Sequence, residues 1–83
     1  MKATAFETIM SQIFEQARET KEDITVNITL KNGDNYTFST SDNEEMAPET
    51  CEINGIIQIY AGEHCDEYGT AWIEVEEIAA IQI

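Results

Sequence analysis

The residues best suited to chemistry in this chain are one histidine and two cysteines: Cys51, and the neighbours His64 and Cys65 within Glu63-His64-Cys65-Asp66. Together they could hold zinc, form a disulfide, or provide a thiol nucleophile with a histidine base. Thirteen residues separate the cysteines, unlike the closely paired C-x₂-C ligands of structural zinc sites. Adjacent carboxylates also disfavour the reactive thiolate. We therefore expect free thiols, no enzymatic activity, no metal and no cofactor; a zinc site and a disulfide are the alternatives.

Calcium binding is a second chemistry that an acidic loop suggests. Asp42 begins a stretch, D-N-E-E-M-A, that aligns with the D-x-[DN]-x-[DN]-G calcium loop. Met46 at the fifth position lacks the required oxygen ligand, and Ala47 stands where the sharp turn needs glycine. The sequence therefore does not predict a calcium site.

The net charge of -13 is unevenly distributed along the chain. The four basic residues all lie in the first 31 positions: Lys2, Arg18, Lys21 and Lys31. From Asn32 to Ile83 there are twelve acidic residues and no basic one. Nucleic-acid affinity comes largely from Lys and Arg that neutralise phosphates, so we expect no direct binding to nucleic acid. The acidic segment is also rich in isoleucine, so it should fold and display its charge on a structured surface.

The length of 83 residues predicts one domain, residues 1–83, with a small core. Self-association is one way to stabilise such a core, so a homo-oligomer is compatible with the sequence. No apolar run approaches the roughly 20 residues of a membrane span, and Glu7 interrupts the N-terminal region where a signal peptide needs apolar residues. We expect a cytoplasmic protein without membrane contact.

A helix is predicted over residues 5–20 by apolar residues at three- and four-residue steps. Thr4 and Glu7 form a T-x-x-E capping box, which would start the helix near Ala5. The apolar stripe should pack on a sheet, and its members are Phe6, Ile9, Met10, Ile13, Phe14 and Ala17.

Strands are predicted from about residue 23 onward, where apolar residues alternate at period two: Ile24, Val26, Ile28 and Leu30. Asn32-Gly33 marks a hairpin. The bulky residues of both arms share a face if Leu30 pairs with Tyr36, which predicts an odd-length loop, Asn32-Gly33-Asp34.

The remainder predicts an acidic surface loop over residues 39–49 and a second hairpin at Asn54-Gly55. Two further strands follow: Ala71, Ile73 and Val75 alternate with polar or aromatic residues, and the chain ends in AAIQI. Short connections favour meander topology. The predicted class is α+β, an N-terminal amphipathic helix packed on a small, strongly bent antiparallel sheet or barrel of four to six strands.

The hairpin, V-x-I-x-L-K-N-G-x-x-Y from Val26 to Tyr36, resembles the first motif of Sm-like proteins, and the ending IEVEEIAAIQI resembles that family's close. This resemblance implies a helix-capped small barrel that is completed by a strand, a 3₁₀ turn and a final strand. Phe38 departs from the family's usual glycine, and Glu76-Glu77 replaces its Arg-Gly pair. These departures and the charge indicate that RNA binding does not carry over.

Carboxylates at regular spacing could imitate the phosphates of DNA. On one strand face, Glu74 and Glu76 would stand about 6.6 to 6.8 Å apart, close to two phosphate steps. Trp72 on the same face would anchor the contact; alternatively it fills a small second core against the helix. The first hypothesis is thus a nucleic-acid mimic that blocks the basic groove of a nucleic-acid-binding protein. Its predicted contact residues are Asp42, Glu44, Glu45, Glu49, Glu63, Asp66, Glu67, Trp72, Glu74 and Glu76.

In size and charge the chain resembles the small acidic inhibitors encoded by phages and mobile elements, including anti-CRISPR and anti-restriction proteins. The second hypothesis is a Sm-like assembly or ligand-binding module without RNA binding, which associates through its isoleucine-rich last strand. A closed ring would bring together subunits that each carry a net charge of -13. Salt would have to screen the repulsion between them.

Overall fold

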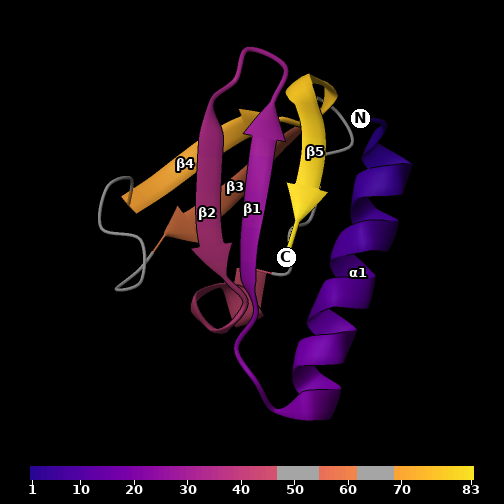
Figure 1. Ribbon diagram of the computed structural model, residues 1–83, viewed down its shortest axis with the longest axis vertical. Coiled ribbons are helices and arrows are strands. Elements are labelled where there is room, and N and C mark those ends of the chain that lie inside the picture. The colour runs from indigo at the N-terminus through magenta and orange to yellow at the C-terminus, as the bar shows by residue number, and fades with distance from the viewer. Residues whose placement is uncertain (47–54, 62–68) are drawn as a thin grey trace.

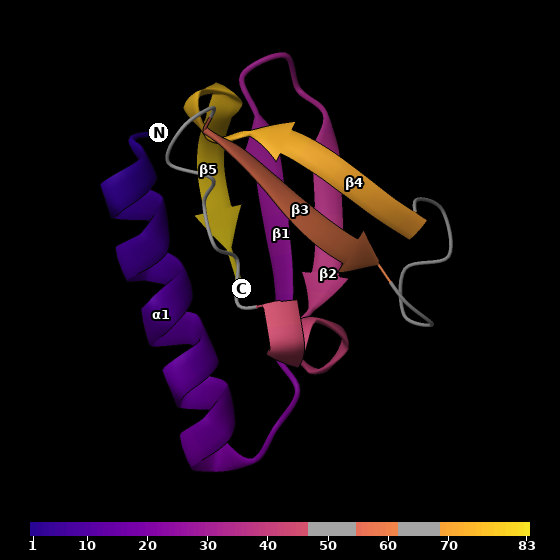
Figure 2. The ribbon, with the colours of Figure 1, turned by 180° about the vertical axis from the view of Figure 1, so that it is seen from behind.

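The computed structural model describes residues 1–46, 55–61 and 69–83, which form one helix and five strands. The elements follow in the order α1 (Ala3–Thr20), β1 (Thr25–Leu30), β2 (Asn35–Ser39), the 3₁₀ segment η1 (Ser41–Met46), β3 (Ile56–Ala61), β4 (Gly69–Glu74), the 3₁₀ turn η2 (Val75–Glu77) and β5 (Ile78–Gln82). The strands make two antiparallel sheets, β2-β1-β5 and β3-β4, which cross obliquely, and α1 runs beside β5 (Figures 1 and 2). The α+β prediction is confirmed, but the described strands do not close into a barrel.

Helix α1 carries the predicted apolar stripe but begins earlier than predicted. Phe6, Met10, Ile13 and Phe14 are all buried. The amide of Phe6 donates to the carbonyl of Lys2 at 3.0 Å, which closes the first turn at Ala3. The capping-box prediction was wrong, because the N-cap is Lys2, which makes no side-chain cap bond, and Thr4 lies inside the helix.

The β1–β2 hairpin has an odd-length loop, Lys31 to Gly33. The amide of Leu30 donates to the carbonyl of Asp34 at 2.8 Å, and the amide of Gly33 donates to the carbonyl of Leu30 at 3.0 Å. Gly33 has a φ of +95°, a conformation that a residue with a side chain adopts only with strain. The loop length is therefore three residues, as predicted, although it begins one residue earlier.

The register of this hairpin differs from the predicted one by two residues. Ile28 pairs with Tyr36 and Val26 with Phe38, whereas the prediction paired Leu30 with Tyr36. Side chains alternate with a period of two, so a shift of two leaves every residue on its predicted face. Val26, Ile28 and Phe38 are accordingly all buried.

The last strand overturns the meander prediction. β5 pairs with β1 rather than with its predecessor β4. The turn η2 redirects the chain between them, and the amide of Lys31 donates to the carbonyl of Glu77 at 2.8 Å where the two sheets meet. β1 thereby gains a hydrogen-bonding partner on both edges, which suits a strand whose Val26 and Ile28 are fully buried.

A buried asparagine joins the two sheets. Asn43 in η1 is 2% exposed, and its side-chain amide donates to the carbonyls of Ser39 and Tyr60, both at 2.9 Å. Its side-chain oxygen accepts from the amide of Tyr60, also at 2.9 Å. One side chain thus pairs with both backbone groups of Tyr60, as a neighbouring strand would. Residues 41–46, predicted as loop, form the 3₁₀ segment that carries it.

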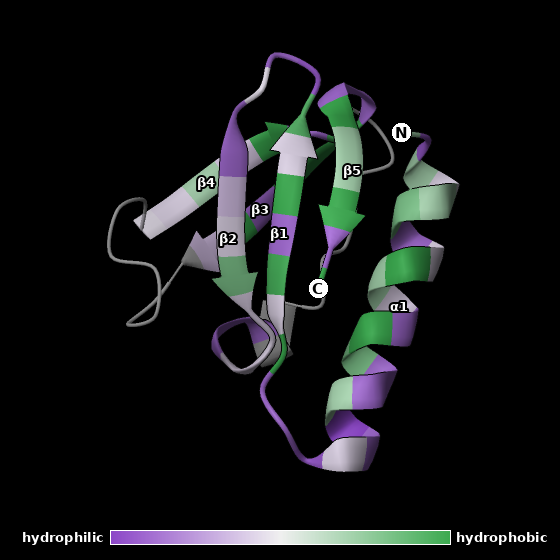
Figure 3. Ribbon diagram, viewed as in Figure 1, coloured by the Kyte–Doolittle hydropathy of each residue, from purple (hydrophilic) through white to green (hydrophobic). Residues whose placement is uncertain are grey.

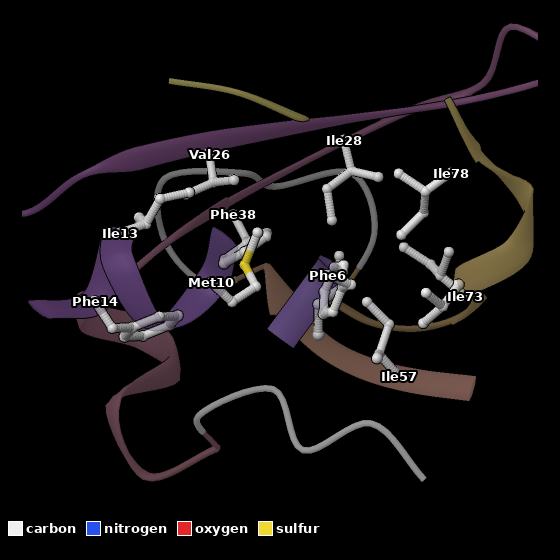
Figure 4. Packing of buried hydrophobic residues seen from close by; sticks show 12 residues of the cluster. Phe6, Met10, Ile13, Phe14, Val26, Ile28, Phe38, Ile57, Ile73 and Ile78 are labelled. Atoms are coloured by element: carbon white, nitrogen blue, oxygen red, sulfur yellow. The ribbon is translucent and has the colours of Figure 1, made fainter. Parts of the chain in front are cut away.

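The core lies between the two sheets and against α1. Hydrophobic and hydrophilic residues alternate along β1 (Figure 3). In Figure 4, Phe6 of the helix lies between Ile28 on one side and Ile57 on the other, and Met10 belongs to the same cluster. The buried hydrophobic residues are Phe6, Met10, Ile13, Phe14, Val26, Ile28, Phe38, Ile57, Ile59, Ile73, Val75 and Ile78.

Candidate functional site

The pairing of β3 with β4 decides which of their residues face outward. Ile57 and Ile59 of β3 and Ile73 of β4 are buried toward the core. The intervening positions must therefore point to the opposite side of this two-stranded sheet. Directly opposed pairs on that outer face are Gln58 with Trp72, Tyr60 with Thr70, and Ile56 with Glu74.

Two aromatic side chains dominate this outer face. Trp72 is 66% exposed and Tyr60 is 44% exposed. They stand diagonally across the strand pair, a separation of about 7 to 8 Å that aromatic side chains can span. The exposure of Trp72 rules out the alternative in which it fills a second core against the helix. An aromatic side chain that folding leaves in water is suited to burial against a partner.

Glu74 is the carboxylate that the sheet places beside Trp72, on the side away from Tyr60. It lies two residues after Trp72 on the same face of β4 and is exposed. The two strands contain no other charged residue. We call Tyr60, Trp72 and Glu74 the aromatic face.

The predicted ladder of Glu74 and Glu76 along one strand is wrong. β4 ends at Glu74, and Glu76 lies in the 3₁₀ turn η2. The two-residue step of a strand therefore does not separate these carboxylates. Val75 and Ile78 are both buried in the core. The turn η2 allows both side chains to point inward while Glu76 stays exposed.

The other predicted contact residues are only partly described. Asp42 is half-buried in η1, and its carboxylate accepts from the hydroxyl of Ser39 at 3.1 Å, a local structural role. The backbone of Glu44 and Glu45 belongs to the same 3₁₀ segment. The predicted contact residues that lie outside the described part of the chain are Glu49, Glu63, Asp66 and Glu67.

Basic groups lie at the two ends of α1 and near the turn η2, where the N-terminal ammonium of Met1 donates to the carbonyls of Glu76 and Ile78 at 3.2 and 3.1 Å. Arg18 is in the last turn of α1 and Lys21 follows that helix. Lys2 precedes the helix and Lys31 lies in the β1–β2 loop. β3 and β4 themselves contain no Lys or Arg.

A hollow of about 650 Å³ opens where α1 ends, between Phe14 and Ala17 of the helix and Thr40 after β2. Its charged lining is balanced, with Arg18 and Lys21 against Glu22 and Asp23. The carboxylate of Asp23 accepts from the hydroxyl of Thr40 at 3.1 Å and the amide of Ser41 at 3.0 Å.

Desolvation raises the pKa of the Asp23 carboxyl, but hydrogen bonds from Ser41, Thr40 and Ser39 outweigh it and hold the pKa below its ordinary value. Sequence reasoning missed this hollow, because its walls meet only through the pairing of β1 with β2. Its balanced charge does not select a ligand of either sign.

Tyr60 and Gln58 are further residues of the outer face that sequence reasoning missed. The alternation of Gln58 and Tyr60 with Ile57 and Ile59 contained the signal. It acquires a functional meaning only once the register places these residues beside Trp72.

Metal and thiol chemistry stays a matter of prediction. Among residues 1–46, 55–61 and 69–83, no three metal-ligating side chains gather. Cys51, His64 and Cys65, like the first arm of the second predicted hairpin at residues 51–53, lie outside those ranges. Within them, no helix combines the length and hydropathy needed to cross a bilayer.

Known proteins provide no further guide to this face. Comparison of the chain with protein-family models, with curated proteins and with solved structures gives no match. The geometry of the aromatic face and the charge of the chain are the features that bear on function.

Proposed function

We propose that this chain is a non-enzymatic acidic protein that binds and blocks the basic groove of a nucleic-acid-binding protein, of the kind that anti-CRISPR and anti-restriction inhibitors target. The aromatic face is its contact surface. The observation that carries the proposal is Trp72, 66% exposed and followed on the same face by Glu74. Interfaces obtain most of their binding energy from a few large anchors, among which tryptophan is prominent.

The charge of the chain supports a basic partner. A net charge of -13 attracts a groove lined by Lys and Arg, raises the rate of encounter and repels nucleic acid itself. Glu74 and Glu76 do not lie on one strand. The proposed contact therefore does not depend on carboxylates that are spaced like the phosphates of DNA. The contact requires an exposed aromatic side chain on a negatively charged protein. The bound protein then excludes nucleic acid by occupying the partner's groove.

The test is a pull-down at low salt from a lysate of the source organism, followed by elution with duplex DNA. A captured nucleic-acid-binding protein that duplex DNA releases is the expected result. Glu74→Lys should abolish capture, whereas Glu19→Lys, the same charge change on an exposed position of α1, should preserve it. Capture that resists both DNA and salt, or that both variants weaken equally, contradicts the proposal.

The second candidate is an assembly module of the Sm-like kind. It is favoured by the succession of β4, the 3₁₀ turn η2 and β5, and by the exposure of Ile83, 63%, which follows the last strand. Analytical ultracentrifugation over a range of protein and salt concentrations tests it. A stable multimer at physiological salt favours assembly, and a monomer at all concentrations counts against it.

A further inference from the structure

The aromatic face offers one carboxylate beside flat aromatic surface. Trp72 and Glu74 are two residues apart on β4, about 6.6 to 6.8 Å along the strand. Tyr60 stands diagonally from Trp72 on the neighbouring strand, and Gln58 stands directly opposite it. A ligand that lies on the indole is therefore within reach of the carboxylate.

A cation with a flat, delocalised charge fits both parts of this surface. The face of an indole ring attracts cations, and the guanidinium group of arginine also stacks on it in plane. The same group donates two parallel hydrogen bonds to a carboxylate, which the compact ammonium of lysine cannot do. Arginine is thus the side chain that uses Trp72 and Glu74 simultaneously.

We propose that the partner places an arginine side chain on the aromatic face, with its guanidinium stacked on Trp72 and hydrogen-bonded to Glu74. This inference rests on the proposed function, because it names the residue of the basic partner that occupies the site. The groove is then recognised through one arginine that is otherwise used to bind phosphate, and the remaining acidic residues supply long-range attraction.

Other occupants of the face fit less well. A nucleobase could stack on Trp72, but its phosphates would meet a chain of net charge -13. A second copy brings the same negative charge, and its single arginine, Arg18, lines the same hollow as Glu22 and Asp23. The charge on this face therefore favours a basic partner.

The experiment uses the only tryptophan of the chain as its reporter. Two peptides of equal length and charge, one with arginines and one with lysines on a glycine-serine background, are titrated at low salt while Trp72 emission is followed. The arginine peptide should bind about fivefold to tenfold more tightly, as expected for stacking together with a bidentate contact.

Variants separate the local contact from net charge. Glu74→Gln and Glu19→Gln remove the same charge, one on the aromatic face and one on the helix. Only Glu74→Gln should remove the preference for arginine. Binding of a dye-labelled peptide to Trp72→Leu, followed by anisotropy, should lose the same preference while circular dichroism shows a folded chain.

Each contrary result has a distinct meaning. Equal affinity for the two peptides, still dependent on Trp72, overturns the arginine inference and leaves the proposed function standing. Binding that Glu74→Gln and Glu19→Gln weaken equally, or no binding by either peptide, overturns both. Emission that changes with single-stranded oligonucleotide, or with protein concentration alone, identifies a nucleobase or a second copy as the occupant and also overturns the inference.

Discussion

The outer faces of the two sheets follow the same alternation but hold opposite kinds of residue. On the β1–β2 sheet the outward side chains are short and bonded to one another. Asn27 donates to the hydroxyl of Thr37 at 3.1 Å, and Thr29 donates to Asn35 at 2.8 Å. On the β3–β4 sheet the outward positions hold Trp72, Tyr60 and Glu74 together with Ile56, Gln58 and Thr70.

The difference separates a surface that is complete in water from one suited to a partner. Short polar side chains that satisfy one another need no further contact. Trp72 instead is 66% exposed to water, and in the proposal above it is the partner that buries it. The location of a functional surface is thus indicated by what folding leaves unburied, more than by where the charges lie.

The attachment of the second sheet to the first should be its most sensitive point. Asn43→Ala leaves the amide of Tyr60 and two carbonyls without their partner, so the free energy of unfolding should fall by about 2 to 4 kcal/mol. Urea denaturation measures it. Asn27→Ala, which removes an amide from the half-exposed face of β1, should lose no more than about 1 kcal/mol. Equal losses would mean that Asn43 does not join the sheets.

Removal of the exposed anchor should affect binding and spare stability. Trp72→Ala should weaken binding of the partner, or of an arginine peptide, by about tenfold or more. The free energy of unfolding should change by under about 0.5 kcal/mol, because the side chain is mostly in water. Anisotropy and thermal unfolding measure the two quantities. Thr25→Ala on the other outer face should alter neither, and a marked loss of stability in Trp72→Ala would assign the indole a structural role.

The β1–β2 loop should be sensitive to replacement of its glycine, Gly33. Gly33→Ala should cost about 1 kcal/mol, because φ is +95°. No heavy atom lies within 4 Å of an added Cβ, so the loss is one of backbone strain rather than of space. Gly33→Asn should lose less, since asparagine adopts positive φ more readily. Thermal unfolding compares the two variants, and equal losses would contradict this account.

The smallest effect is expected at the hollow beside α1. The folded pKa of Asp23 lies below its unfolded value, so its contribution to stability is present above the unfolded pKa and disappears as pH falls through the folded pKa. Asp23→Asn should therefore be slightly less stable than the parent chain at pH 7. The difference should begin to shrink below about pH 4 and should vanish once the pH is below the folded pKa. Urea denaturation at several pH values measures it; a difference that grows in acid would have the wrong sign.

Particular residues show how far the sequence predicted the fold. The stripe from Phe6 to Phe14 and the alternation of Val26 with Ile28 were sufficient to predict α1 and β1. The hairpin faces were predicted correctly despite the shifted register, because parity alone determines them. The capping box failed because Thr4 and Glu7 also fit inside a helix that starts earlier. The Glu74 and Glu76 ladder failed because alternation of buried and exposed residues continues into η2 without a strand.

The sequence by itself determined the α+β class, the two sides of each strand and the charge of -13. Only the tertiary structure decided that β5 pairs with β1, that Asn43 joins the sheets and that Trp72 stays in water. The physical reason is that a period of two sorts residues onto two faces but does not say what covers each face. That depends on which distant segments pack there. On the β3–β4 sheet, Ile57, Ile59 and Ile73 are buried in the core and the aromatic face is exposed.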